Sequence, residues 1–155
     1  MKINIRKVTK TDLKYVLNLI QELAKFEKEP LAVAITLQEL ENDFNSHLFD
    51  CFIAENNQAE IIGMALFYNR YSTWKGKTIH LEDLIVTQQY RGKGVGKALL
   101  NLVINEAKKQ KVRRVEWAVL NWNTPAIDFY KKVGAHILND WYVVQLDEKG
   151  ILNYN

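Results

Sequence analysis

A glycine-rich turn between a strand-like run and a helix-like run constrains this chain more than any other feature. Residues 80–86 read as a largely apolar strand, and residues 95–109 carry apolar side chains at helical spacing. Between them, residues 91–97 read RGKGVGK. Glycines permit tight turns, and the backbone N–H groups at a helix N-terminus attract phosphate. The sequence therefore predicts a site for a phosphate-bearing ligand at residues 92–97, with a turn that binds nothing as the simpler alternative.

Spacing excludes two common phosphate loops. A dinucleotide-binding turn needs G-x-G-x-x-G, and here Gly96 comes one residue early. A P-loop needs four residues between its glycines and then Lys followed by Ser or Thr, whereas three residues separate Gly92 from Gly96 and Ala98 takes the hydroxyl position. The segment instead resembles the acetyl-coenzyme A pyrophosphate loop of the GCN5-related N-acetyltransferase superfamily, R-G-x-G-V-G-K-x-L after a strand that ends in valine.

A second motif lies downstream, where residues 121–135 read NWNTPAIDFYKKVGA. Asn123 or Thr124 can cap a helix, Pro125 suits its first turn, and Gly134 suits the position just after its end. The pattern N-x-x-A-x-x-F-Y-x-x-x-G-A resembles the second signature of the same superfamily. Because both signatures occur in the right order, we disfavour the simpler interpretations, in which the glycine-rich segment is a turn without a ligand and Tyr130 is only a core aromatic.

Other segments resemble one branch of that superfamily, the diamine (spermidine/spermine) acetyltransferases and their thialysine-acetylating type. Residues 71–83 read YSTWKGKTIHLED, and residues 22–27 and 118–123 fit the same branch. The resemblance runs from residue 5 to residue 146. It implies acetyl-CoA as co-substrate, a small polyamine, diamine or lysine-like amine such as thialysine as acceptor, direct attack in a ternary complex, and a homodimer.

The resemblance also implies a set of residues that bind acetyl-CoA. Two strands beside the loop helix, residues 77–86 and 113–120, would splay apart and admit the pantetheine arm to strand backbone. The expected cofactor-binding residues are Leu84, Ile85, Val86, Arg91, Gly92, Lys93, Gly94, Val95, Gly96, Lys97, Asn123 and Tyr130.

Amine acetylation requires removal of a proton from an ammonium group and protonation of the departing thiolate. By match to the superfamily, Tyr130 is the expected general acid. Glu82 is the expected residue that orients the amine and accepts its proton through water, with Asp83 beside it. Adjacent strand residues point to opposite faces, so only one of the two carboxylates faces the amine unless a bulge intervenes. Other expected substrate contacts are Phe26, Glu27 and Trp74, because acidic and aromatic groups suit a polycation.

One segment departs from the polyamine enzymes. The acidic, glycine-containing segment before the C-terminal Trp is shortened here to residues 138–141, LNDW, which favours a shorter acceptor such as thialysine, lysine or a diamine. Two other functions stay open, an N-acetyltransferase for proteins or peptides and a non-catalytic module that binds coenzyme A. The bulk of Tyr71 and Trp74 favours a small-molecule pocket, and Tyr130 argues against a mere binder.

Composition indicates one globular domain over residues 1–155. The apolar share is 48%, the charged share is 25% and the net charge is +3, which suits an anionic cofactor without indicating nucleic acid. Cys51 is the single cysteine and lies in a predicted strand, which predicts a buried, inert thiol and a reducing compartment. The three histidines show no ligand-like spacing, so no metal is expected. No apolar run reaches about 18 residues and no signal-peptide pattern appears, so we expect a cytoplasmic protein without a membrane segment.

Periodicity predicts an α+β fold with a mixed sheet. The resemblance implies the same fold, a mixed, mostly antiparallel sheet flanked by helices, with splayed central strands. The predicted strands are residues 2–8, 48–55, 61–70, 77–86, 112–120 and 141–146. The predicted helices begin near residues 9, 36, 95 and 123, and the second opens with a capping box formed by Thr36 and Glu39.

Overall fold

The computed structural model describes residues 2–154, and the chain divides into two compact units, Met1–Ala118 and Val119–Asn155. Each unit is described here on its own. The prediction of a single domain over residues 1–155 stays a prediction.

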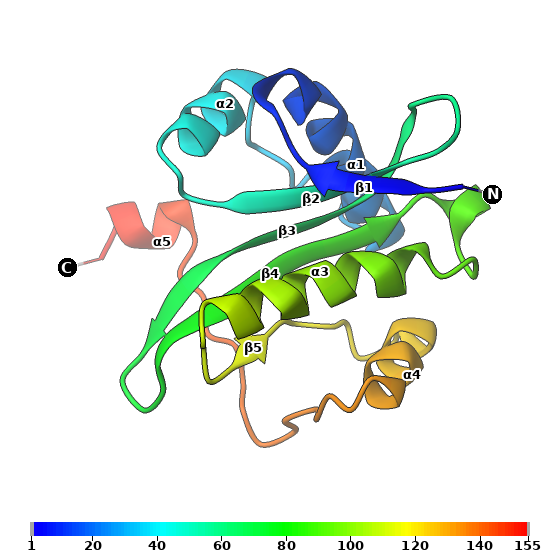
Figure 1. Cartoon of the computed structure of the whole chain (residues 1–155). Helices are drawn as coiled ribbons and strands as arrows, with labels where there is room; N and C mark the ends of the chain where they lie inside the picture. The colour runs from blue at the N-terminus through cyan, green and yellow to red at the C-terminus, as the bar shows by residue number, and fades with distance from the viewer. Residues whose placement is uncertain (1, 155) are drawn as a thin grey trace. The chain divides into compact units, whose positions relative to one another are not determined.

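The first unit is built on a five-stranded sheet in the order β1-β2-β3-β4-β5 (Figure 1). Neighbouring strands from β1 to β4 pair antiparallel, and β5 pairs parallel to β4. The predicted mixed, mostly antiparallel sheet is therefore confirmed. The strands are β1 (Asn4–Lys7), β2 (Asp50–Glu55), β3 (Ile61–Ser72), β4 (Gly76–Val86) and β5 (Val115–Glu116).

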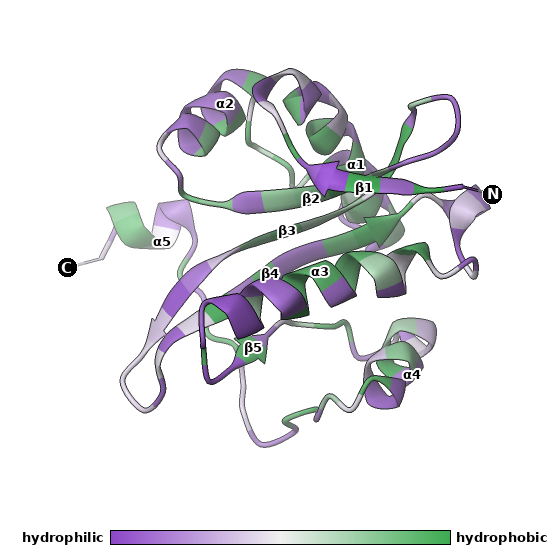
Figure 2. Ribbon diagram, in the orientation of Figure 1, coloured by the Kyte–Doolittle hydropathy of each residue, from purple (hydrophilic) through white to green (hydrophobic). Residues whose placement is uncertain are grey.

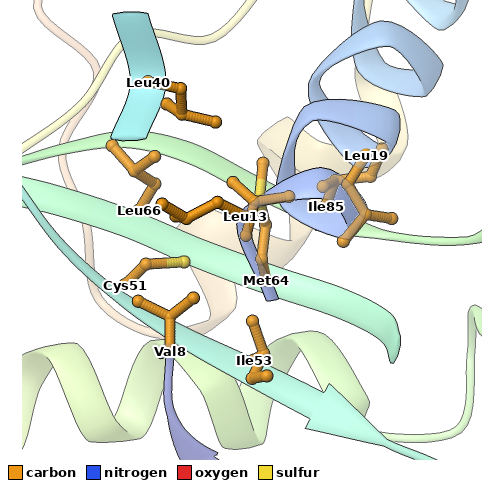
Figure 3. Close-up of a cluster of buried hydrophobic side chains, with 10 residues drawn as sticks. Val8, Leu13, Leu19, Leu40, Cys51, Ile53, Met64, Leu66 and Ile85 are labelled. Atoms are coloured by element: carbon orange, nitrogen blue, oxygen red, sulfur yellow. The ribbon is translucent and has the colours of Figure 1, made fainter. Parts of the chain in front are cut away.

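Helices α1 (Leu13–Phe26) and α2 (Leu37–Asn45) cover one face of this sheet. A short 3-10 turn, η1 (Lys10–Asp12), leads into α1, and the predicted capping box of Thr36 and Glu39 opens α2. Figure 3 shows apolar side chains of both helices meeting those of β2, β3 and β4. The core cluster consists of Val8, Leu13, Val16, Leu19, Leu40, Cys51, Ile53, Met64, Leu66 and Ile85. Cys51 is buried as predicted, and burial raises the pKa of its thiol far above the ordinary range.

Helix α3 (Val95–Lys109) packs against the other face of the sheet and has the predicted bounds. Gly63 of β3 leaves room for the β4 backbone, because a Cβ there would lie only 2.8 Å from the carbonyl oxygen of Ile85, and it would also touch Leu99 of α3 at 3.4 Å. Figure 2 shows hydrophobic residues along the middle of the sheet and the inner side of α3, with hydrophilic residues toward the hairpin that joins β3 and β4.

A β-bulge interrupts the pairing of β3 with β4 at Glu82. Leu66 pairs with Asp83 and Phe67 pairs with Leu81, which leaves Glu82 as the extra residue. Asp83 lies on the face covered by α1, because it is opposite the core residue Leu66. The bulge shifts the alternation by one residue, so Glu82 lies on that same face. The bulge that the sequence analysis left open is therefore present, and both carboxylates share one face.

The ladder between β4 and β5 contains two residue pairs, Ile79 with Val115 and His80 with Glu116. In an antiparallel pair, backbone N–H and C=O groups of alternate residues point to opposite sides. The Thr87 N–H donates to Ile62 of β3, so by alternation the backbone groups of Leu84 and Val86 point away from β3. The ladder with β5 ends at His80, as expected for strands that splay, and it leaves the backbone of Leu84 and the N–H of Val86 for a ligand, because the Val86 carbonyl accepts a hydrogen bond from Arg91.

The second unit contains α4 (Thr124–Lys132) and α5 (Glu148–Leu152). Asn123 caps α4, Pro125 lies in its first turn, and Gly134 follows its end with φ of +88°, as predicted. The prediction of a strand at residues 141–146 is wrong, because this segment has no ladder partner among residues 2–154 and is irregular. The strand predicted at residues 112–120 is shortened to Val115–Glu116. Helix α5, capped by Asp147, was not predicted.

Candidate active site

The glycine-rich loop ends in an uncapped helix N-terminus. Gly92 and Gly94 have φ of +72° and +83°, a conformation that side chains with a Cβ rarely adopt. Gly94 is the N-cap of α3, and no side chain caps this helix. The first backbone N–H groups of α3 have no carbonyl partner within the helix, and the helix dipole adds positive charge there. This arrangement fits the pyrophosphate of coenzyme A.

Side chains of the loop fix its shape. Arg91 donates from Nε to the carbonyl oxygen of Val86 at 2.8 Å, and its guanidinium lies 4.7 Å from the ring centre of Phe26. Lys93 donates from Nζ to the carbonyl oxygen of Gln89 at 2.9 Å. The loop is thereby tied to the end of β4 and to the last residue of α1. Phe26 is thus placed beside the phosphate loop.

Three carboxylates gather near the bulge, and we call Glu27, Glu82 and Asp83 the acidic cluster. Burial, and then the nearby charges of Glu82 and Glu27, together raise the pKa of Asp83 to about 6. Burial also raises the pKa of Glu27, which caps the C-terminus of α1. The partial negative charge of that helix end adds to the three carboxylates. Such a group is adapted to bind a cation.

Glu82 is held by aromatic neighbours on the same face. The Tyr68 hydroxyl donates to Oε2 of Glu82 at 2.8 Å, and His80 Nε2 lies 3.5 Å from the same oxygen. The rings of Tyr68 and His80 are 5.3 Å apart. Burial, and then the hydrogen bond to Glu82, raises the pKa of Tyr68 to about 12, so its phenol stays a donor. The Glu82 side chain is still 51% exposed and can reach a ligand or water.

Substitution of Asp83 should stabilise the protein at neutral and alkaline pH. An unfolded chain has an aspartate pKa near 4, whereas Asp83 titrates at about 6 in the fold. Between these values the folded protein binds more protons, so this carboxyl lowers stability as pH rises through that window. Asp83→Asn should therefore raise the free energy of unfolding near pH 8 by about 2–3 kcal/mol, with no gain near pH 4. Urea unfolding at both pH values, with exposed Asp50→Asn as control, tests this; an equal effect at both would contradict it.

Ile85 and Trp74 are two predicted site residues that the fold does not place toward the proposed ligands. Ile85 has its side chain in the core, and by alternation its backbone faces β3, so Leu84 and Val86 are better placed for the cofactor. Trp74 lies in the turn between β3 and β4 and is 78% exposed. Glu82 lies six positions after Gly76 along the strand, about 20 Å at the usual rise. Within one chain the fold does not bring Trp74 to the acidic cluster.

In the second unit, α4 carries the two remaining predicted site residues. The Asn123 side-chain oxygen accepts a hydrogen bond from the Ala126 N–H at 3.4 Å, which leaves its amide nitrogen able to donate to a ligand. Tyr130 lies seven residues later, about two helical turns, so both residues share one face of α4. Its ring lies 5.3 Å from that of Phe129.

Sequence analysis did not assign a role to His80, Arg70 or Glu116. Strand alternation could have indicated His80, because residues 80 and 82 are two positions apart on a predicted strand and therefore point to the same face. Arg70 and Glu116 could not be found in this way. Their contact at 2.6 Å depends on which strands are neighbours and on the register of β3 and β5 against β4.

Comparison with known proteins now decides the family. The model of the acetyltransferase (GNAT) family matches residues 14–135, which include the loop, the bulge and α4. The chain belongs to the acetyltransferase (GNAT) family. Members of this family use acetyl-CoA as co-substrate, and this chain is an N-acetyltransferase acting on amines.

The relatives agree with the branch predicted from the sequence. The thialysine N-epsilon-acetyltransferase of Bos taurus is 36% identical over 145 residues, covering 88% of this chain and 85% of that protein. The protein of the same name from Caenorhabditis elegans is 36% identical over 150 residues, covering 93% and 91%. Among solved structures, an integron cassette protein from the mobile metagenome of V. cholerae matches with a TM-score of 0.78 at 21% identity, covering 98% of this chain and 96% of that chain. That likeness confirms the fold.

Two features are absent from residues 2–154. No group of three or more His, Cys, Asp and Glu side chains in this range is arranged to hold a metal ion. No helix in the same range combines the length and apolarity needed to cross a bilayer.

Proposed function

We propose that this GNAT protein transfers the acetyl group of acetyl-CoA to the primary amine of a small polyamine, diamine or lysine-like acceptor. The acceptor attacks directly in a ternary complex, without an acetylated enzyme. Supporting this, relatives of 36% identity over most of the chain are named for an acceptor with a terminal amine.

The observation that carries the proposal is the bulge at Glu82. It places Glu82 and Asp83 on one face of β4, and the charge of Glu27 at the end of α1 also acts on Asp83. Phe26, the last residue of α1 and the neighbour of Glu27, contacts Arg91 of the phosphate loop. A cation-binding cluster thus adjoins the proposed cofactor loop, as transfer of acetyl to an amine requires.

The proposed reaction has the following steps. The acceptor arrives as an ammonium and loses a proton through water to the Glu82 carboxylate, which frees its lone pair. The amine nitrogen then attacks the thioester carbonyl carbon, so that a C–N bond forms, the C–S bond breaks, and the nitrogen releases its extra proton to water. Tyr130 donates its phenolic proton to the departing thiolate and regains a proton from solvent. In the first unit, the backbone N–H groups of residues 92–97 and the backbone of Leu84 and Val86 hold the cofactor; the roles of Asn123 and Tyr130 are those that the superfamily resemblance implies.

The two alternatives make different demands on the chain. A protein or peptide N-acetyltransferase needs an open groove and has no use for three carboxylates around its acceptor amine. A non-catalytic module that binds coenzyme A needs neither the acidic cluster nor Tyr130. We favour the small amine because the pKa values of Asp83 and Glu27 are raised, and a bound cation would lower both by stabilising the charged carboxylates.

Glu82→Gln should lower turnover at least about tenfold, because the amide keeps the shape of the side chain but cannot accept the proton. Thiol release from acetyl-CoA, measured with small amines and with peptides, checks both the residue and the acceptor. Small primary amines should be acetylated, and more slowly below about pH 6, where Asp83 takes up a proton and where more of the amine is charged. Acetyl-CoA affinity should stay near that of the wild type.

Efficient turnover of peptides without turnover of any small amine would contradict this proposal and show that the protein is a protein or peptide acetyltransferase. Binding of acetyl-CoA without transfer to either class would favour the binding module. The homodimer and the cytoplasmic location stay proposals that come from the resemblance and from the single cysteine. Light scattering on the purified full chain tests the dimer.

A further inference from the structure

A strip of polar side chains leads from Glu82 toward the hairpin end of the sheet. His80 lies in the middle, with Nε2 3.5 Å from Glu82 Oε2 and Nδ1 4.0 Å from Glu116 Oε1. Arg70 forms a 2.6 Å ion pair with Glu116, and Arg114 Nε lies 3.0 Å from the other oxygen of Glu116. His80 and Glu116 are cross-strand partners, so the strip lies on the face of the acidic cluster.

The two ends of this strip carry opposite charge. One end is the acidic cluster, with three carboxylates. At the other end two arginines, Arg70 and Arg114, face the single carboxylate of Glu116, which leaves one positive charge in excess. A diamine or polyamine is cationic at both ends and would be repelled at the arginines. A molecule with an amine at one end and a carboxylate at the other matches both ends.

The arginine end has donors to offer. The side chain of Arg70 is 56% exposed and that of Arg114 is 37% exposed. Each guanidinium carries five N–H donors, and Glu116 can accept from only some of them. Within residues 2–154, His80 Nδ1 is a buried atom without a hydrogen-bond partner. Planar guanidinium groups bind carboxylates in bidentate geometry, so the arginine end fits a carboxylate of the acceptor.

The length of the strip suits a side chain of lysine size. Successive contacts of 3.5, 4.0 and 2.6 Å connect Glu82 to Arg70 through His80 and Glu116. An extended lysine measures about 8 Å from its terminal nitrogen to its carboxylate. With a hydrogen bond at each end, it can bridge Glu82 and the arginines while its methylenes cross the rings of Tyr68 and His80.

We propose that Arg70 and Arg114 recognise a carboxylate at the far end of the acceptor, so that the preferred acceptor is an amino acid with a terminal side-chain amine. This inference rests on the proposed function and narrows it. Neither the loop nor the acidic cluster distinguishes such an amino acid from a diamine, and the two arginines supply that distinction.

Lysine and cadaverine form the matched test, because they differ only by the carboxylate. The wild-type protein should favour lysine over cadaverine by at least about tenfold in kcat/KM, the size of one charge-assisted hydrogen bond. The double variant Arg70→Gln/Arg114→Gln should lower that preference at least about tenfold, mainly through a higher KM for lysine. Lys77→Gln removes an exposed cation from the opposite face of β4 and should leave the preference unchanged.

Lysinamide provides a test on the unaltered protein, because it blocks the carboxylate without any substitution; it should behave like cadaverine. Equal kcat/KM for lysine, lysinamide and cadaverine, unaffected by the arginine substitutions, would overturn the inference and leave amine acetylation intact. If no amine in the set is acetylated, the proposed function itself fails.

Discussion

Gly94→Asp should abolish the thermal stabilisation that acetyl-CoA gives to this protein. Gly94 has φ of +83° at the N-cap of α3, where backbone N–H groups and the helix dipole face the proposed pyrophosphate. An aspartate there adds a negative charge to a site built for anions. At a ligand concentration 100 times Kd, wild-type stabilisation should be about 2.7 kcal/mol, and the variant should show none.

Two companion variants separate charge from backbone strain. Gly94→Asn has the same shape without the charge and tolerates positive φ, so it should retain part of the acetyl-CoA shift. Gly76→Asp places the same charge on another positive-φ glycine, in the turn between β3 and β4, and should leave the full shift. A full shift in Gly94→Asp would show that acetyl-CoA does not bind at this loop.

Tyr130→Phe should reduce turnover by roughly a hundredfold, the usual contribution of a general acid. The substitution keeps the ring, and with it the contact with Phe129, but removes the proton that the proposed mechanism gives to the thiolate. A tyrosine phenol ordinarily has a pKa near 10, so it is protonated at neutral pH and can donate. Steady-state rates across pH, together with acetyl-CoA affinity and thermal unfolding, measure the effect.

The control for this variant is Tyr142→Phe, which alters an exposed tyrosine of the same unit. Its kinetics should equal those of the wild type. A Tyr130→Phe protein with near-normal turnover would show that water or another group protonates the thiolate. Loss of acetyl-CoA binding in the same variant would make Tyr130 a binding residue.

Much of the fold could be predicted because its signals are local. The helix that follows Gly94, the capping box of Thr36 and the glycine after α4 depend on a few neighbouring residues, and all three are confirmed. The strand predicted at residues 141–146 failed for a non-local reason. Apolar and β-branched residues favour an extended chain, but a strand also needs a partner, and this segment pairs with none among the described residues.

The candidate site also combines features that depend on neighbouring residues with features that depend on distant ones. The phosphate loop could be identified from its residues, whereas the shared face of Glu82 and Asp83 depends on a bulge between two strands that adjacent residue types do not reveal. The raised pKa of Asp83 likewise depends on burial and on the position of Glu27 at the end of a distant helix. Trp74 was predicted from its turn, and the length of β4 separates it from Glu82.

Direct transfer from acetyl-CoA to a small amine is tested most directly by intact-mass analysis of protein and product in one reaction. With acetyl-CoA alone the protein should keep its unmodified mass. After lysine is added, acetyl-lysine and free coenzyme A should appear together in equal amounts while the protein mass stays unchanged. An acetylated protein that forms before lysine is added and then loses its acetyl group to lysine, or release of coenzyme A without an acetylated amine, would contradict the account.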